Sequence, residues 1–221
     1  ELKEVYALPK ASQTLIDQSD IDVLGWLQSK IGEAFATKEA TAFHTGVGVA
    51  DPRGILEYTN VATSDATRAW GQLEYLPSGA SGAFHTTKMD PLHDMVGSLK
   101  AQYRRGAVWL MNRGTAKTLR KLKEATTDAY LWQTSVMAGQ PDMLLGYPVE
   151  IDEYMPDIAA NSLSLAFGNI GKAYCVVEKP GVRFLSDPYT SPPYVKVLGY
   201  RRVGAGIYNF EALKLMKFAA A

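Results

Sequence analysis

The longest regular pattern in the sequence is a helical repeat of apolar residues between Asp20 and about Thr45. Apolar side chains recur there at near-helical spacing, at Leu24, Leu27, Ile31, Phe35 and Ala42. Ser19 or Asp20 is a natural N-cap, because its side-chain oxygen can accept from the first backbone N–H groups of the helix. About 25 residues at ~1.5 Å each would span roughly 40 Å. The pattern therefore predicts one uninterrupted helix that is longer than a small domain is wide.

The segments that flank this helix are predicted to be a short strand and a turn-rich connection. Leu2–Leu8 has the alternation of a strand, and Pro9 ends it. Gly46 stops the helix, and the chain is rich in turn residues from there to Gly82. A phosphate-binding glycine loop must open a helix, whereas Gly46-Val47-Gly48 follows one. We therefore interpret these glycines as a helix stop and not as a nucleotide site.

The middle of the chain predicts a helix, a strand and a second helix. Asp90-Pro91 is a favourable helix start, because proline at the first helical turn loses no hydrogen bond. Ala107–Met111 is a short continuous apolar run, typical of a strand that is covered on both faces. Helical spacing returns from Thr115 to Ala125.

The last third of the chain is predicted to be rich in strands. The expected strands are Val149–Ile151, Leu163–Phe167, Ala173–Val177, Val182–Leu185, Tyr194–Leu198 and Ala212–Phe218. Lys179-Pro180-Gly181 has the residues of a type II turn and predicts a hairpin between the two strands beside it. Helices and strands thus give an α+β fold class.

Composition narrows the possible functions. The chain has 221 residues, 47% of them hydrophobic, and equal numbers of basic and acidic residues, 23 of each. This balance disfavours a protein that grips nucleic acid through its phosphates. Cys175, the single cysteine, lies in an apolar run and is expected to be buried. The chain has no apolar run near the ~18 residues of a membrane helix and no signal-peptide layout, so we expect a soluble protein.

Candidate catalytic and metal-binding residues are few. The three histidines are His44, His85 and His93, and none has a recognisable nucleophile motif nearby. His85 and His93 are too far apart in sequence for a typical zinc site. We therefore expect no catalytic residue, no cofactor and no metal.

The order of these segments resembles the major capsid protein of tailed bacteriophages, the fold named after phage Hong Kong 97. The resemblance runs over essentially the whole chain and includes the related capsids of gene transfer agents. It rests on the following segments: Lys3–Ser12, Glu33–Phe35, Gly46–Leu56, Val108–Asn112, Leu145–Val149, Ala166–Asn169, Ala173–Tyr174 and Val195–Phe210. None of them is diagnostic alone, but their order and spacing together are specific.

The resemblance implies a division of the chain into five parts. Residues 1–12 would be the remnant of an extended loop, residues 13–90 and 171–207 a peripheral domain with the long helix and an elongated sheet, and residues 91–168 and 208–221 an axial domain. In that family a longer arm precedes the position where this sequence begins. A covalent crosslink between subunits, as some capsids of that family form, would need a Glu or an Asn in the strand after Tyr194. Neither residue type occurs between Tyr194 and Tyr208, so association between subunits is expected to be non-covalent.

The function that the resemblance implies is self-assembly. The chain would form pentamers and hexamers of an icosahedral shell around double-stranded DNA, with a portal and other head proteins as partners. It would be assembled in the bacterial cytoplasm and found in the virion, and it would not be an enzyme. An infectious phage, a prophage remnant and a gene transfer agent remain open. The alternatives are an encapsulin-type nanocompartment and an α+β enzyme or small-molecule binding domain with an unfamiliar site.

Two charged stretches of the predicted axial domain are candidate contacts between subunits. The region from Lys100 to Lys123 contains no acid, and a short acidic run follows after Pro148. The candidate residues are Arg104, Arg105, Arg113, Lys117 and Arg120 on the basic side and Glu150, Asp152, Glu153 and Asp157 on the acidic side. Since contacts in a ring of identical subunits join different edges, these stretches are predicted to face each other between neighbours. A solvated helix face is the alternative for the basic stretch.

Overall fold

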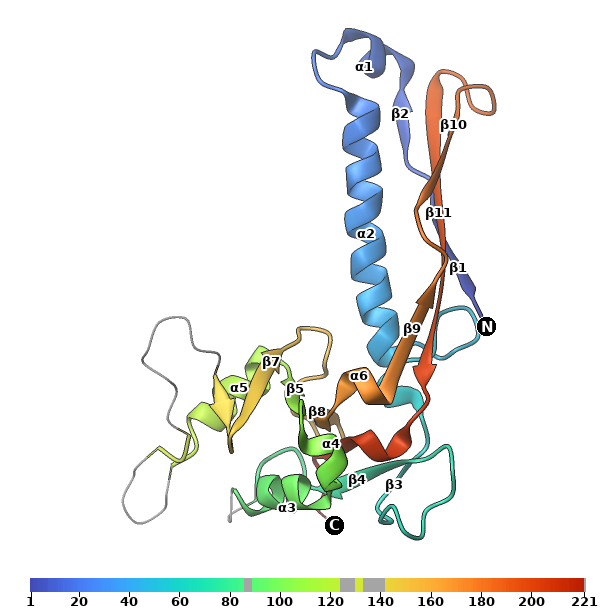
Figure 1. Ribbon diagram of the computed structural model, residues 1–221. Coiled ribbons are helices and arrows are strands. Elements are labelled where there is room, and N and C mark those ends of the chain that lie inside the picture. Colours follow the sequence, from blue (N-terminus) through green and yellow to red (C-terminus); the bar gives the residue numbers. More distant parts are fainter. Residues whose placement is uncertain (86–88, 124–129, 133–141, 221) are drawn as a thin grey trace. The chain divides into compact units, whose positions relative to one another are not determined.

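A computed structural model describes residues 1–85, 89–123, 130–132 and 142–220 (Figure 1). The chain divides into two compact units. Unit 1 comprises residues 1–57 and 176–206, and unit 2 comprises residues 58–175 and 207–221. The sequence placed residues 58–90 with the long helix, whereas their contacts place them in unit 2.

The long helix of unit 1 is confirmed as a single element, α2 (Val23–Thr45). It begins slightly later than the sequence indicated, because Asp22 is the N-cap and its Oδ1 accepts from the Gly25 N–H at 3.0 Å. Gly46 ends it as expected, with its N–H donating to the carbonyl of Ala42. A short helix that the sequence did not indicate, α1 (Gln13–Gln18), precedes it, and the turn η1 (Ile55–Glu57) follows.

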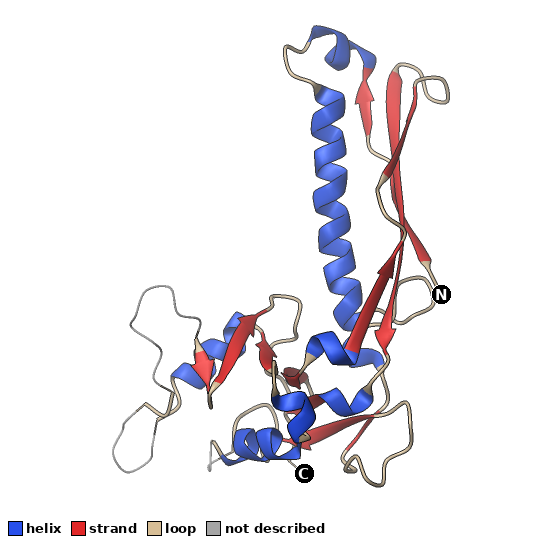
Figure 2. Ribbon diagram, in the orientation of Figure 1, coloured by secondary structure: helices blue, strands red, loops and turns tan. Residues whose placement is uncertain are grey.

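The sheet of unit 1 is built around one long strand, β11 (Tyr194–Ile207). β1 (Lys3–Ala7) and β10 (Arg183–Asp187) pair antiparallel on its two sides. β2 (Lys10–Ser12) and β9 (Tyr174–Glu178) also pair with β11 (Figure 2). The sheet is therefore narrow, and every strand in it depends on β11.

One face of this sheet packs against α2. The buried side chains of Leu27, Ile31 and Phe35 on the helix meet Ala11 and Val197 on the strands. Gly199 lies directly beneath the helix, where an added Cβ would stand 2.7 Å from Cγ2 of Ile31. The close approach of the helix to β11 thus depends on a residue without a side chain.

Two expectations for this region are wrong. Gly181 has the positive φ of 85° that the predicted turn requires, but β9 and β10 do not form a hairpin. Each pairs with β11 instead, so the turn joins two strands that follow one another along the same partner. Cys175 is exposed and not buried, because four of the five residues of β9 are exposed in this narrow sheet.

Unit 2 contains a seven-stranded mixed sheet in the order β3-β4-β12-β8-β5-β7-β6. Its strands are β3 (Asn60–Val61), β4 (Leu73–Pro77), β5 (Val108–Met111), β6 (Met143–Leu144), β7 (Tyr147–Ile151), β8 (Leu163–Gly168) and β12 (Leu213–Lys217). The helices are α3 (Asp90–Ser98), α4 (Ala101–Arg104), α5 (Arg113–Arg120) and α6 (Ile170–Ala173), with the turn η2 (Phe210–Ala212).

The expected helix, strand and helix of the middle region are confirmed. α3 has Pro91 in its first turn, and β5 lies between β8 and β7. Asn112 caps α5, which begins before Thr115 and ends at Arg120, earlier than the predicted end at Ala125. The core forms around Trp109, whose indole N–H donates to the carbonyl of Leu144 and whose ring contacts Phe167 at 4.3 Å between centroids.

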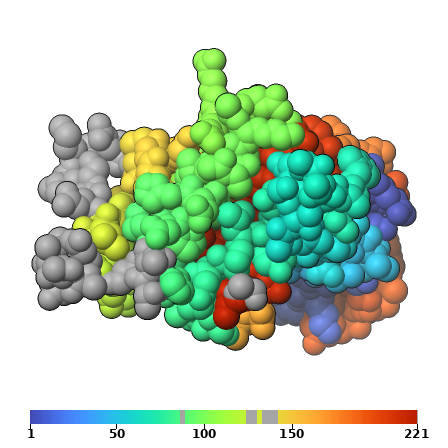
Figure 3. Space-filling model, turned by 90° about the horizontal axis from the view of Figure 1, so that it is seen from below, coloured from blue at the N-terminus to red at the C-terminus, as the bar shows by residue number. Residues whose placement is uncertain are grey.

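A buried cluster of charges lies beside β12. Lys214 is fully buried, and its ammonium contacts Oδ1 of Asp65 at 2.6 Å and the carboxylate of Glu74. Arg68 binds the same Asp65 oxygen at 2.7 Å. The cluster fixes the loop between β3 and β4 to the sheet. In Figure 3 the teal residues of this region and the green residues of α3 leave only parts of the red C-terminal segment visible.

The cluster also affects the titration of its members. Burial acts to raise the pKa of Asp65, but hydrogen bonds from Lys214 and Arg68 outweigh it and hold the pKa below its usual value. A lowered pKa in the folded state means that the contribution of Asp65 to stability is present above the usual value of about 3.9. It is lost as the pH falls from there through the lowered pKa.

Replacing Gly199 tests the packing of α2 on β11. Gly199→Val should lower the free energy of unfolding by about 1–3 kcal/mol, because the new side chain meets Ile31. Gly32 is the matched control, since it lies on the exposed face of α2 and an added Cβ there meets nothing within 4 Å. Gly32→Ala should raise stability by about 0.5–1 kcal/mol. Thermal unfolding measures both, and equal effects at the two positions would contradict the packing described.

Replacing Lys214 tests the buried charge cluster. Lys214→Met keeps the length of the side chain but leaves two buried carboxylates without their shared ammonium, and it should cost about 3–5 kcal/mol. The exposed Lys172 serves as control, since Lys172→Met should change stability by less than about 0.5 kcal/mol. Urea unfolding followed by tryptophan fluorescence measures the difference. A loss below about 1 kcal/mol for Lys214→Met would show that the cluster adds little to stability.

Candidate assembly surfaces

The face of the unit 1 sheet opposite α2 carries both apolar and charged side chains. Val197, Gly199 and Arg201 face the helix. Successive residues of a strand point to opposite faces, so Leu198, Tyr200 and Arg202 face the other side. Residues paired across neighbouring strands share a face of the sheet, so the partners of these three residues on β1 and β10 lie on the same face. We call this surface the open sheet face; it consists of Glu4, Tyr6, Arg183, Leu185, Leu198, Tyr200 and Arg202.

The exposure of its apolar residues distinguishes this surface from an ordinary solvated sheet. Tyr6 is 73% exposed and Leu185 is 59% exposed. A sheet with one face in water usually alternates apolar residues inward with polar residues outward. Contiguous patches of exposed apolar side chains often mark interaction surfaces. The open sheet face is therefore a candidate contact surface.

Arg201 shows how charge is arranged on the helix side of the same strand. Its guanidinium contacts Oε2 of Glu39 on α2 at 3.3 Å and also binds the carboxylate of Glu178. Burial raises the pKa of the Glu39 carboxyl, and the attraction of Arg201 opposes that effect. Arg201 is thus engaged by two carboxylates within unit 1.

The predicted basic residues of unit 2 have different surroundings. Arg104 donates to the carbonyls of Leu99 and Gly97, so it stabilises the connection between α3 and α4. Arg120 pairs with Asp142 and lies over the ring of Trp132. Arg105 and Lys117 are exposed. Of these four cations, Arg105 and Lys117 are the ones for which the described residues provide neither an ion pair nor a side-chain hydrogen bond.

The predicted acidic residues follow one another along β7 and the loop after it. Glu150 is exposed on β7, and Asp157 is exposed further along. Asp152 is partly buried and accepts from the Tyr154 N–H. Glu153 contacts the guanidinium Nε of Arg113 at 3.3 Å within the same chain. The structure thus brings one member of each charged stretch together, whereas the sequence predicted that they would meet across subunits.

The Arg113–Glu153 contact is weak. The two side chains are 80% and 53% exposed. Exposed ion pairs contribute about 0–1 kcal/mol, since water solvates both charges. The pair can therefore exchange partners at an interface at little cost.

Sequence reasoning did not identify the open sheet face. The alternation in β1 and β11 was visible, but which neighbours share a face depends on the register of strands that are distant in sequence. The residues considered for chemistry do not converge either. Nδ1 of His44 hydrogen-bonds the carbonyl of Ala40 within α2, and His93 is exposed on α3. Within the described ranges, no group of three or more His, Cys, Asp or Glu side chains is placed to hold a metal ion.

Among the described residues, none of the helices combines the length and the hydropathy that a membrane span requires.

Comparison with solved structures gives strong matches to gene transfer agent (GTA) capsids. The capsid of an empty GTA particle, computed with C5 symmetry, is 44% identical, with a TM-score of 0.92 over 99% of this chain and 74% of that one. The capsid of a native GTA particle matches equally well, over 99% of this chain and 73% of that one. The SrpI encapsulin of Synechococcus elongatus PCC 7942 is 15% identical, with a TM-score of 0.65 over 98% of this chain and 73% of that one, and shares the fold alone.

Sequence comparison leads to the same group. No curated protein matched the chain. A model of the phage capsid family, however, matches residues 1–218, nearly the whole sequence. The expected Hong Kong 97-like α+β fold is confirmed by these structural matches. The chain therefore belongs to the phage capsid family, and it is a structural capsid protein and not an enzyme.

Proposed function

We propose that the chain is the major capsid subunit of a gene transfer agent or a closely related phage particle, and that it forms pentamers and hexamers of an icosahedral shell. The observation that carries this proposal is the 44% identity to the capsids of GTA particles over 99% of the chain. Identity at this level over a whole chain supports a shared mode of assembly, whereas the 15% identity to an encapsulin supports a shared fold alone. A prophage remnant would carry the same subunit.

The two units take different places in the proposed shell. Unit 1, with α2 and the sheet around β11, corresponds to the peripheral domain of the family, and unit 2 corresponds to the axial domain around the symmetry axis of a capsomer. This assignment moves residues 58–90 from the peripheral to the axial part, since their contacts lie within unit 2.

The shell would enclose double-stranded DNA without binding particular sequences. The chain has equal numbers of acidic and basic residues, 23 of each. Tight binding of DNA would need uncompensated cations to contact its phosphates. The charge balance therefore supports a shell that contains DNA without binding it tightly. A portal and other head proteins would complete the particle, assembly would take place in the bacterial cytoplasm, and the finished shell would be part of the virion.

Contacts around the capsomer axis would use the charged stretches of unit 2. Glu150, Asp152 and Asp157 of one subunit would meet Arg105 and Lys117 of the next. Arg113 and Glu153 would contribute by exchanging their weak intrachain contact for partners on the neighbour. Arg104 and Arg120 are already held within the chain, and we assign them a smaller share of the interface. Such contacts would set the register of assembly more than its total energy.

Electron microscopy of the full-length protein tests the shell function directly. We expect closed icosahedral particles after expression or after purified subunits are concentrated. Discrete monomers or dimers at high concentration, under conditions that keep the protein folded, would contradict the proposal. Mass measurement in solution separates these outcomes without relying on particles that survive on a grid.

Charge reversal at Glu150 tests the contacts around the capsomer axis. Glu150→Lys should reduce assembly about tenfold or more at low salt, because like charges would face each other. Glu150 is a sharper choice than Glu153, since Glu153→Lys also breaks the contact with Arg113 inside the chain. Asp94, exposed on α3, is the control, and Asp94→Lys should assemble normally. Unchanged yield and unchanged salt dependence for Glu150→Lys would rule out these contacts.

A further inference from the structure

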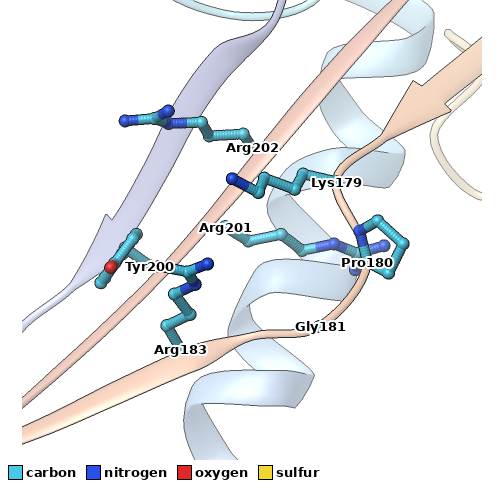
Figure 4. A pocket seen from close by; sticks show the side chains of 7 residues that line it. All are labelled: Lys179, Pro180, Gly181, Arg183, Tyr200, Arg201 and Arg202. Carbon is cyan, nitrogen blue, oxygen red and sulfur yellow. The ribbon is translucent and has the colours of Figure 1, made fainter.

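A small basic cavity that the function proposed above does not use lies beside the open sheet face of unit 1 and shares Arg183, Tyr200 and Arg202 with it. The cavity has a volume of about 70 Å³ and is lined by Lys179, Pro180, Gly181, Arg183, Tyr200, Arg201 and Arg202 (Figure 4). It lies where β9 ends and β10 begins. We call it the basic pocket.

The charges of the basic pocket are only partly compensated. Arg201 runs toward Pro180 in Figure 4 and is engaged by Glu39 and Glu178. Arg202 shares its charge with Glu4 on β1, with Nε 3.1 Å from Oε2. Lys179 and Arg183 are exposed and have no ion-pair partner among the described residues. The pocket therefore presents at least two uncompensated cations, Lys179 and Arg183, which suits a carboxylate or another small anion.

An acidic segment with exposed apolar residues lies at one end of the same unit. Asp17, Asp20 and Asp22 are the only charged residues between Gln13 and Ser29. The apolar residues beside them are unusually exposed, namely Leu15 at 54%, Ile21 at 72% and Trp26 at 55%. We call these six residues the acidic tip; in Figure 1 they belong to α1, the start of α2 and the loop between them.

A chain cannot place its own acidic tip in its own basic pocket. The N–H of Gln13, the first residue of α1, donates to the carbonyl of Pro193, so the tip lies beside the start of β11. The pocket lies further along β11, at Tyr200–Arg202. At ~3.3 Å per residue the two positions are roughly 23–30 Å apart along the strand. The complementary partner must therefore come from another molecule.

We propose that the acidic tip of one subunit docks on the basic pocket of a second copy of the chain. The carboxylate of Asp20 would enter the pocket between Lys179 and Arg183, and Ile21 and Trp26 would cover apolar residues of the open sheet face such as Tyr6 and Leu185. The contact joins two different surfaces, so it is heterologous and extends into rings or lattices, as a shell requires. The proposal rests on the shell function and identifies one contact between subunits of that shell.

The apolar part of the surface favours a protein partner over nucleic acid. DNA phosphates would satisfy the cations of the pocket but would leave Tyr6 and Leu185 exposed. The acidic tip supplies both the negative charge and the apolar side chains that the pocket and its surroundings lack.

A charge exchange between the two surfaces tests the proposal. Asp20 has no hydrogen bond or ion pair within the described residues, and Arg183 has no ion pair there, so neither substitution removes a stabilising contact of the subunit. Arg183→Glu and Asp20→Arg should each weaken association between subunits about tenfold or more, because each places like charges together. The variant with both substitutions should associate within about threefold of the unchanged protein, since the charges are exchanged across the contact.

The measurement uses the full-length protein. Sedimentation velocity reports association between subunits, and electron microscopy reports closed particles. Lys172→Glu, at an exposed position of α6, is the control and should associate normally. Circular dichroism confirms that each variant is folded. Normal association of either single variant, or failure of the double variant to recover, overturns the docking.

Two further outcomes separate this proposal from its alternatives. If Arg183→Glu lowers the affinity for a DNA duplex while Asp20→Arg associates normally, the pocket binds phosphate and the docking is wrong. If the charge exchange restores association between subunits but no closed particles form, the docking stands and the shell function fails.

Discussion

The packing of α2 on one face of the sheet around β11 is the constraint on which the architecture of unit 1 depends. Leu27, Ile31 and Phe35 cover the side of the strand that carries Val197 and Gly199. A second layer on the other side is absent from the described part of unit 1. Because a strand alternates its side chains between two faces, Leu198, Tyr200 and Arg202 of β11 point away from the helix and stay partly or fully exposed.

This half-covered sheet connects stability with assembly. The residues that hold the helix and those that would contact another copy alternate along one strand, as with Gly199 beneath Ile31 and Tyr200 on the open sheet face. A change in the register of β11 would move each set to the wrong side. The same pairing of β1 and β10 with β11 therefore determines both the core of the unit and the pattern of its surface.

Unit 2 is organised differently. Its sheet has a core around Trp109 and Phe167, and the loop between β3 and β4 is held by the buried contacts of Lys214 with Asp65 and Glu74. Buried charges of this kind are costly to separate, because removing one partner leaves the others uncompensated. At its surface Arg105, Lys117, Glu150 and Asp157 are exposed, and Arg113 and Glu153 are only weakly paired. These residues are therefore available to a neighbour in the shell.

The sequence by itself determined the elements with strong local signals and the family. The helical repeat from Leu24 to Ala42 predicted α2, and the ordered segments carried the resemblance to phage capsids. Tertiary structure decided what depends on distant partners: β9 and β10 pair with β11 and not with each other, Cys175 is exposed, Lys214 is buried, and Arg113 meets Glu153 within one chain. The physical reason is that periodicity reports which face of an element is apolar, whereas strand register and ion pairing depend on residues far away in the chain.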